Sequence, residues 1–196
     1  MTKPAIYLAS ASPRRRELLT QIGVPFELLR CEIDETPLAG ELPHPYVARL
    51  ARAKAEAGVA AYRAAGLPPR LLLAADTTVA LGEAILGKPV DVADAEAMLA
   101  SLSGKSHQVM TGVAVTDGER VEVVVSVSQV RFRILSAAEI RSYVATGEPM
   151  DKAGSYGAQG KGALLIAAME GSFSGVIGLP LAETGALLQG FDYPIW

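Results

Sequence analysis

The sequence predicts an α/β protein, and three observations support this. Short apolar runs of strand character alternate with segments whose apolar residues recur at helical spacing. The chain opens with such a unit, a strand followed by a tight loop and a helix within residues 5–22. With 196 residues, half of them hydrophobic, and no linker or internal repeat, the chain can build one substantial core or two closely joined lobes. We therefore expect one domain over residues 1–196.

The opening unit carries an unusual charge pattern. Residues 5–9 are the strand, Ser12 is a natural N-cap, and Pro13 suits the first helical position because its missing N–H is not needed there. Arginines at positions 14–16 then face the positive end of the helix dipole, which is unfavourable unless an anion binds. A bound phosphate would satisfy helix N–H groups, serine hydroxyls and guanidinium groups together. The alternative is a solvated basic turn.

A second strand, residues 26–31, is followed by an acidic segment that includes Glu35. A helix is expected from Pro45 to about residue 65, closed by Gly66 and two prolines. Lys54 lies on the apolar stripe of this helix, four residues after Leu50. A lysine that faces inward either extends to the edge of the core or meets an anion.

The next apolar run, residues 71–75, predicts a central strand that ends at Asp76. Ligands of α/β sheets commonly bind at the carboxyl ends of strands, so a functional carboxylate is favoured over a cap or turn residue. Residues 79–81 resemble another strand, and no helix begins at Asp76.

Residues 82–88 match the opening of a phosphate-binding P-loop, which we reject. Pro89 stands where that motif needs a Ser or Thr hydroxyl, residues 83–86 have an apolar hairpin pattern, and the next helix begins only at Asp91. Lys88 remains as a lone cation before a rigid proline.

The second half of the chain predicts a hairpin of two long strands, residues 107–116 and 121–132, joined through Asp117 and Gly118. Ser136 and Glu139 form a capping box that opens a helix to about residue 145. The glycine-rich, polar segment 147–160 is expected to be a ligand-facing loop. A buried strand over residues 163–169 and a last helix through Leu188 complete the expected elements.

Composition excludes several classes of function. A net charge of −3 gives no electrostatic support for nucleic-acid binding. Cys31 is the single cysteine, so neither an intrachain disulfide nor a thiolate metal site is expected. The longest apolar run, residues 163–169, is too short to span a bilayer, and no signal peptide is evident. We expect a cytoplasmic protein with no membrane partner.

Nine segments together resemble the Maf family of nucleoside triphosphate pyrophosphatases, in the order that the family has them. They are Leu8-Ala-Ser-x-Ser-Pro-Arg-Arg15, Asp34-Glu35, Ala53-Lys-Ala55, Ala75-Asp-Thr77, Gly87-Lys-Pro89, Ser103-Gly-x-x-His107, Gly147-Glu-Pro-x-Asp-Lys-Ala-Gly154, Tyr156-Gly-x-Gln-Gly160 and Gly178-Leu-Pro180. The resemblance implies a mixed, twisted sheet with flanking helices and two lobes around a central cleft, as in inosine triphosphate pyrophosphatases. It also implies a divalent-metal-dependent enzyme, usually a homodimer, that removes unwanted nucleotides.

Three positions divide the family by substrate, and Arg14, Thr77 and Gln159 match the branch that acts on dTTP and UTP. The branch that acts on 7-methyl-GTP typically carries a tryptophan in place of the arginine. Two alternatives stay open: a 7-methyl-GTP-type enzyme, and a nucleotide-sensing regulator of cell division that needs no turnover.

The expected site binds a triphosphate through Ser10 and five cations, which are Arg14, Arg15, Lys54, Lys88 and Lys152. Asp76 and Glu35 are the expected ligands of the divalent metal that the resemblance implies, which is magnesium or manganese, with cobalt as a further option. Magnesium prefers oxygen ligands and keeps several waters, so one or two carboxylates suffice. Asp76 is the expected general base, with Glu35 as the alternative. Thr77 and Gln159 are expected to read the base, and His107 to be structural.

Overall fold

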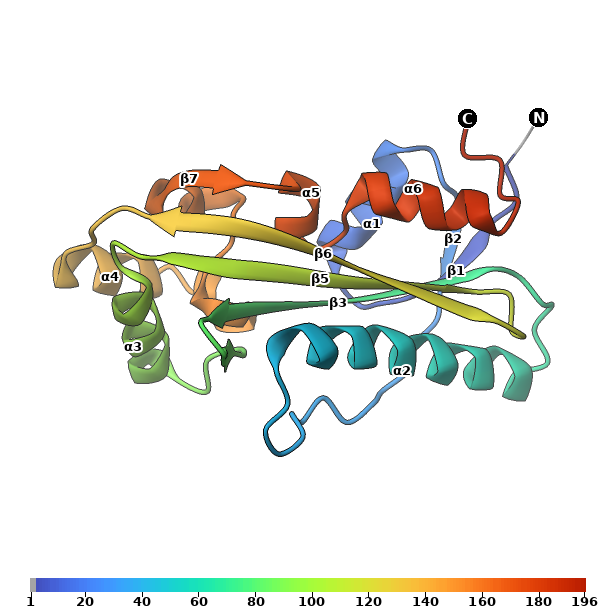
Figure 1. The fold of residues 1–196 in the computed structure, drawn as a ribbon, viewed down its shortest axis with the longest axis horizontal. Helices are drawn as coiled ribbons and strands as arrows, with labels where there is room; N and C mark the ends of the chain where they lie inside the picture. The colour runs from blue at the N-terminus through green and yellow to red at the C-terminus, as the bar shows by residue number, and fades with distance from the viewer. Residues whose placement is uncertain (1–2) are drawn as a thin grey trace.

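The computed structural model describes residues 3–196, and these form a seven-stranded mixed sheet with helices on both faces (Figure 1). The strand order is β2-β1-β3-β5-β6-β7, with β4 paired to β3. Parallel pairs join β1 to β2 and to β3, and the remaining pairs are antiparallel. The strands are β1 Ile6–Ala9, β2 Phe26–Leu28, β3 Leu72–Leu81, β4 Ala84–Leu86, β5 Ser106–Thr116, β6 Val121–Phe132 and β7 Ile166–Glu170. The expected mixed sheet with flanking helices is confirmed.

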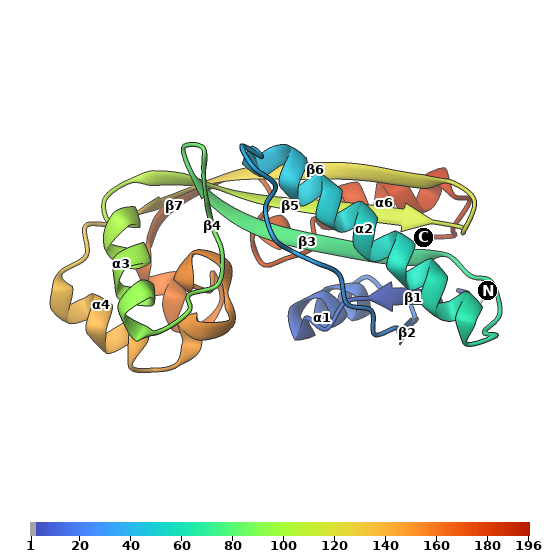
Figure 2. The same cartoon turned by 90° about the horizontal axis from the view of Figure 1, so that it is seen from below.

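The long strands β3, β5 and β6 extend from one end of the molecule to the other and connect two lobes (Figures 1 and 2). One lobe contains β1 and β2 with the helices α1 (Pro13–Gln21), α2 (Pro43–Ala64) and α6 (Leu181–Gly190). The other contains α3 (Val92–Leu102), α4 (Ala137–Val144) and three short 3₁₀ segments, η1 Glu148–Asp151, η2 Ala153–Ser155 and η3 Gly160–Leu165. The short helix α5 (Phe173–Val176) lies against β5 and β6. Separate clusters of buried side chains fill the lobes.

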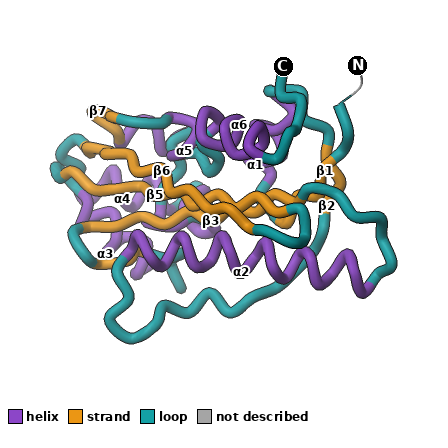
Figure 3. The backbone as a smooth tube through the Cα atoms, turned by 45° about the vertical axis from the view of Figure 1, so that its right-hand side comes forward, coloured by secondary structure: helices purple, strands orange, loops and turns teal. Residues whose placement is uncertain are grey.

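The sheet lies between layers of helices, and Figure 3 shows α2 along one face with α1 and α6 on the other. The long helix α2 approaches the sheet closely at Gly112 of β5. A Cβ atom at this position would lie 2.6 Å from the carbonyl oxygen of Val47, which belongs to the backbone of α2. Only glycine permits this approach. It matters for the site because Gly112 is the register partner of Asp76.

Several local signals in the sequence are confirmed. Asp91 caps α3 by accepting a hydrogen bond from the backbone N–H of Asp94, and Ser136 and Glu139 form both bonds of a capping box. The rejected P-loop is the β3–β4 hairpin, and no helix follows Lys88 directly. Ser12 does occupy the N-cap position of α1, but its side chain makes no capping bond.

Other expectations are wrong. Strand β3 does not end before Asp76 but continues to Leu81, because its antiparallel pairing with β5 extends over the whole segment. Strand β2 stops at Leu28, three residues earlier than expected. The predicted buried strand over residues 163–169 is the 3₁₀ segment η3 followed by the exposed edge strand β7. In η3 the backbone N–H groups of Lys161 and Gly162 donate hydrogen bonds to the Glu148 carboxylate rather than to a neighbouring strand.

Candidate active site

A cavity of about 760 Å³ lies between the two lobes and gathers residues from widely separated stretches of the chain. Nine of the ten side chains that the sequence places in the site line it: Ser10, Arg14, Arg15, Glu35, Lys54, Asp76, Thr77, Lys88 and Lys152. Gln159 does not line the cavity. Its side chain is exposed on the surface, although its neighbour Ala158 is part of the wall.

Asp76 reaches the cavity from the middle of β3 rather than from its end. The parallel neighbour β1 stops pairing at Ala9, opposite Ala74. One side of β3 is therefore uncovered two residues later, while the other side stays hydrogen-bonded to β5. Asp76 is only 8% exposed and is held by a rigid strand that borders the cavity.

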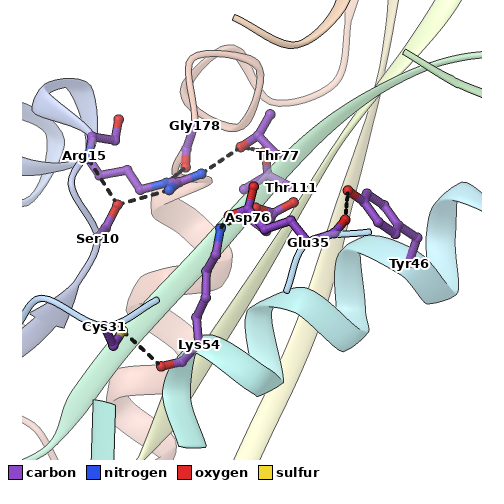
Figure 4. Close-up of polar contacts among 11 residues, drawn as sticks. Ser10, Arg15, Cys31, Glu35, Tyr46, Lys54, Asp76, Thr77, Thr111 and Gly178 are labelled. Carbon is purple, nitrogen blue, oxygen red and sulfur yellow. Dashed lines mark hydrogen bonds and ion pairs between the residues drawn. The ribbon is translucent and has the colours of Figure 1, made fainter. Parts of the chain in front are cut away.

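Lys54 joins the two expected carboxylates (Figure 4). Its ammonium group lies 2.7 Å from Oδ1 of Asp76 and 2.6 Å from Oε1 of Glu35. The lysine on the apolar stripe of α2 therefore meets anions. The Glu35 side chain is half exposed, so burial raises its pKa only in part, and the hydrogen bond and charge of Lys54 outweigh that effect. The pKa of Glu35 is accordingly lowered, and the carboxylate is charged at neutral pH.

Arg15 is buried and binds the protein itself. Its Nε donates to the carbonyl oxygen of Gly178 at 2.8 Å, and its two terminal nitrogens donate to Oγ of Ser10 and Oγ1 of Thr77. Burial lowers the pKa of Arg15, and the charges of Asp76 and Glu35 oppose that shift. Arg15 thus ties α1 to the segment after α5 and to β3.

The Thr77 hydroxyl continues this chain of hydrogen bonds. It lies 2.9 Å from Oγ1 of Thr111, which donates its single hydrogen to the carbonyl oxygen of Gly175. Thr77 must therefore donate to Thr111 while it accepts from Arg15. Arg15 and Thr77, which the sequence assigns to ligand binding, are therefore already hydrogen-bonded within the protein. Arg15 has five N–H hydrogens and uses three of them, so two stay available to a ligand.

The remaining cations differ in how far they are already paired. Lys152 is held by Oδ1 of Asp151 and by the carbonyl oxygen of Glu148, each at 2.6 Å. Within residues 3–196, Arg14 and Lys88 have neither an ion pair nor a side-chain hydrogen bond, and both line the cavity. Arg14 of α1 and Lys88, which follows β4, are therefore free to bind an anionic ligand.

The donor set suits a hard divalent cation that arrives with a ligand. Across residues 3–196 there is no group of three or more His, Cys, Asp and Glu side chains that could enclose a metal ion. Asp76 and Glu35 nevertheless converge on a single point, the Lys54 ammonium group. Magnesium needs only one or two protein carboxylates when waters and phosphate oxygens complete its coordination. Asp76 and Glu35 are the residues that would hold it.

Sequence reasoning missed Tyr46, which lines the cavity and donates a hydrogen bond to the carbonyl oxygen of Glu35 at 2.9 Å. Its position one helical turn before Leu50 was the available signal. His107 does not line the cavity; its Nε2 lies 2.7 Å from the hydroxyl of Tyr156, which does. Burial lowers the pKa of His107 to about 4, so the ring is neutral at pH 7.

No helix among residues 3–196 has the length and apolar character needed to cross a membrane. The family description "Maf-like protein" matches residues 5–191. The chain is 55% identical to the dTTP/UTP pyrophosphatase of Aromatoleum aromaticum, with 97% of each chain covered. It is 52% identical to that of Chromobacterium violaceum, covering 97% of this chain and 96% of the relative, and 50% identical to that of Pasteurella multocida over the full length of both. Since the family match and these relatives all span nearly the whole chain, the chain belongs to the Maf family.

Proposed function

We propose that this chain is a nucleoside triphosphate pyrophosphatase that hydrolyses dTTP and UTP to the monophosphate and pyrophosphate. The relatives that cover 97% or more of its length are named for this activity. The observation that carries the proposal is the convergence of Asp76, Lys54 and Glu35 at one point of a cavity lined by cations of both lobes. Carboxylates facing cations across a cleft are suited to hydrolysing a polyanion.

Each of the cations would bind a different part of the triphosphate. A nucleoside triphosphate carries roughly four negative charges, which favours guanidinium and ammonium donors around the phosphates. Arg14 and Lys88 are free to bind at once, whereas Lys152 and Lys54 would exchange their present carboxylate partners for phosphate oxygens. A divalent cation held by Asp76 and Glu35 would supply further charge neutralisation at the phosphate oxygens.

The chemical step would use Asp76 as a general base. Its carboxylate accepts a proton from a water molecule, whose oxygen forms a bond to the α-phosphorus. The bond from that phosphorus to the bridging oxygen breaks, and the bridging oxygen leaves with pyrophosphate. Proton abstraction by a positioned carboxylate is worth ~10²–10⁴-fold in rate. Glu35 is the alternative base, and it is the more exposed of the two carboxylates.

The three branch-marking residues would act in different ways. Arg14 is free to bind the ligand directly. Thr77 uses its hydroxyl to hold Arg15, so we propose that it affects specificity through the position of that guanidinium group. Gln159 is exposed outside the cavity wall and would reach a nucleobase only if the segment around Ala158 moved inward. In that position a base that does not match the hydrogen-bonding groups of Gln159 would leave them buried and unpaired, which discriminates strongly between bases.

One product assay tests the proposal. The protein is incubated with dTTP, UTP, CTP and 7-methyl-GTP in the presence of magnesium or manganese, and the products are identified by chromatography. We expect monophosphate and pyrophosphate from dTTP and UTP. Orthophosphate would indicate a phosphomonoesterase, cleavage of 7-methyl-GTP alone would indicate the other branch, and nucleotide binding without products would indicate a sensor.

Two variants extend the assay to the base. Asp76→Asn should lower kcat by about 10²–10⁴-fold. Arg16→Met, outside the cavity lining, should leave kcat unchanged. Near-normal turnover of Asp76→Asn would show that Asp76 is not the base.

We further propose that the protein is a cytoplasmic homodimer, which light scattering and cell fractionation would test.

A further inference from the structure

The segment 29–42, which we name the strap, joins β2 to α2 and contains neither helix nor strand. It runs beside the cavity and contributes Cys31, Glu35 and Thr36 to the wall. Loops of this length without regular structure are uncommon in compact domains and are often functional. What holds the strap in place therefore determines where Glu35 lies.

Two side chains of α2 bind consecutive carbonyl groups in the main chain of the strap, those of Glu35 and Thr36. The hydroxyl of Tyr46 donates to the carbonyl oxygen of Glu35 at 2.9 Å, and Nη2 of Arg49 donates to that of Thr36 at 3.2 Å. Arg49 also binds both carboxylate oxygens of Glu41, through Nε and Nη2 at 2.6 Å each. Tyr46 and Arg49 are three residues apart and so lie on the same face of the helix.

Asp76 and Glu35 are held in contrasting ways. Asp76 is buried, and it lies within a strand that pairs with β5 both before and after this residue along the chain. The Glu35 side chain is 48% exposed, and its only side-chain partner within residues 3–196 is Lys54. A triphosphate that attracts Lys54 would remove that partner at the moment when Glu35 is needed. The main-chain bonds from Tyr46 and Arg49 do not depend on Lys54.

We propose that Tyr46 and Arg49 are positioning residues, which fix the main chain of the strap so that the Glu35 carboxylate stays over the cavity when the substrate is bound. This inference rests on the proposed function, in which Glu35 contributes to catalysis. Neither side chain needs to touch the substrate.

The test uses Tyr46→Phe, which removes one hydroxyl and retains the ring. We expect kcat/KM for dTTP to fall roughly fivefold to tenfold, the factor that corresponds to one net hydrogen bond. In a Glu35→Gln background the same substitution should cost less than twofold, because the residue that it positions has already lost its charge. The matched control is Tyr193→Phe, which removes a similar bond, from a tyrosine hydroxyl to the carbonyl oxygen of Pro4, outside the cavity.

Hydrogen exchange gives a readout that does not depend on activity. Backbone amides of residues 29–42 should exchange faster in Tyr46→Phe and in Arg49→Lys, and those of β3 should not change. Arg49→Lys serves as the second variant, because an ammonium group cannot bind Glu41 and Thr36 together in the geometry of a guanidinium group.

Equal losses from Tyr46→Phe in the wild-type and Glu35→Gln backgrounds would overturn the inference, and so would unchanged exchange in the strap. A wild-type protein that cleaves no nucleotide would refute the proposed function instead. The exchange data would in that case still show whether Tyr46 and Arg49 hold the strap.

Discussion

Replacing Gly154 by alanine should loosen the contact between the lobe that carries Lys152 and strand β3. Gly154 has a φ of +68°, and a Cβ atom there would lie 2.8 Å from Cγ1, 2.9 Å from Cβ and 3.0 Å from Cγ2 of Val79. Val79 is 3% exposed and belongs to the core of that lobe, so it has little room to move. The N–H of Gly154 also donates to the carbonyl oxygen of Gly87, next to Lys88.

The expected loss of stability has two parts. A left-handed backbone conformation costs an alanine about 1–2 kcal/mol, and overpacking of a filled core costs about 1–3 kcal/mol. Their sum is about 2–5 kcal/mol. For a chain of this size each kcal/mol corresponds to roughly 2–4 °C in Tm, so Gly154→Ala should melt roughly 10 °C below the wild type.

Gly147→Ala is the matched control. Gly147 has a φ of +75°, but a Cβ atom there would meet nothing within 4 Å beyond its own chain neighbours. It should lose only the backbone part, about 1–2 kcal/mol. Urea unfolding and calorimetry of both variants isolate the contact with Val79, and Val79→Ala should rescue Gly154→Ala in part. Equal stability of the two glycine variants would refute this reasoning.

Three further predictions follow from the site and its surroundings. Lys88→Met should raise KM for dTTP about tenfold, and Arg16→Met should leave KM unchanged, because only Lys88 lines the cavity. Equal KM values for the two variants in steady-state kinetics would contradict this prediction. Arg15→Lys should lower the free energy of unfolding in urea by about 2 kcal/mol, since lysine cannot make the three hydrogen bonds of Arg15, and a neutral result would contradict its anchoring role. Burial lowers the pKa of His107 from 6.5 to about 4, so between these values the unfolded chain binds a proton that the folded protein excludes. Stability should therefore fall by about 3 kcal/mol as the pH drops from 6.5 to 4, and urea titrations of His107→Phe should lack most of this slope.

The sequence by itself determined the features whose signals lie within a few residues of one another. The caps at Asp91 and Ser136 and the turn at Asp117 each depend on neighbouring backbone groups, so composition and spacing reveal them. The inward position of Lys54 follows from helical periodicity in the same way. The motifs further identified the family, because nine short patterns in a fixed order specify far more than any single one.

Only the tertiary structure decided how the site residues are used. The guanidinium group of Arg15 binds Gly178, 163 positions away along the chain, and no local pattern shows that it is already engaged. No local pattern shows why Asp76 borders the cavity either. It does so because β1 ends beside β3, which continues. Tyr46 and Glu35 meet because α2 packs back over the strap. Contacts between distant segments depend on how the lobes pack, and packing is a property of the whole chain.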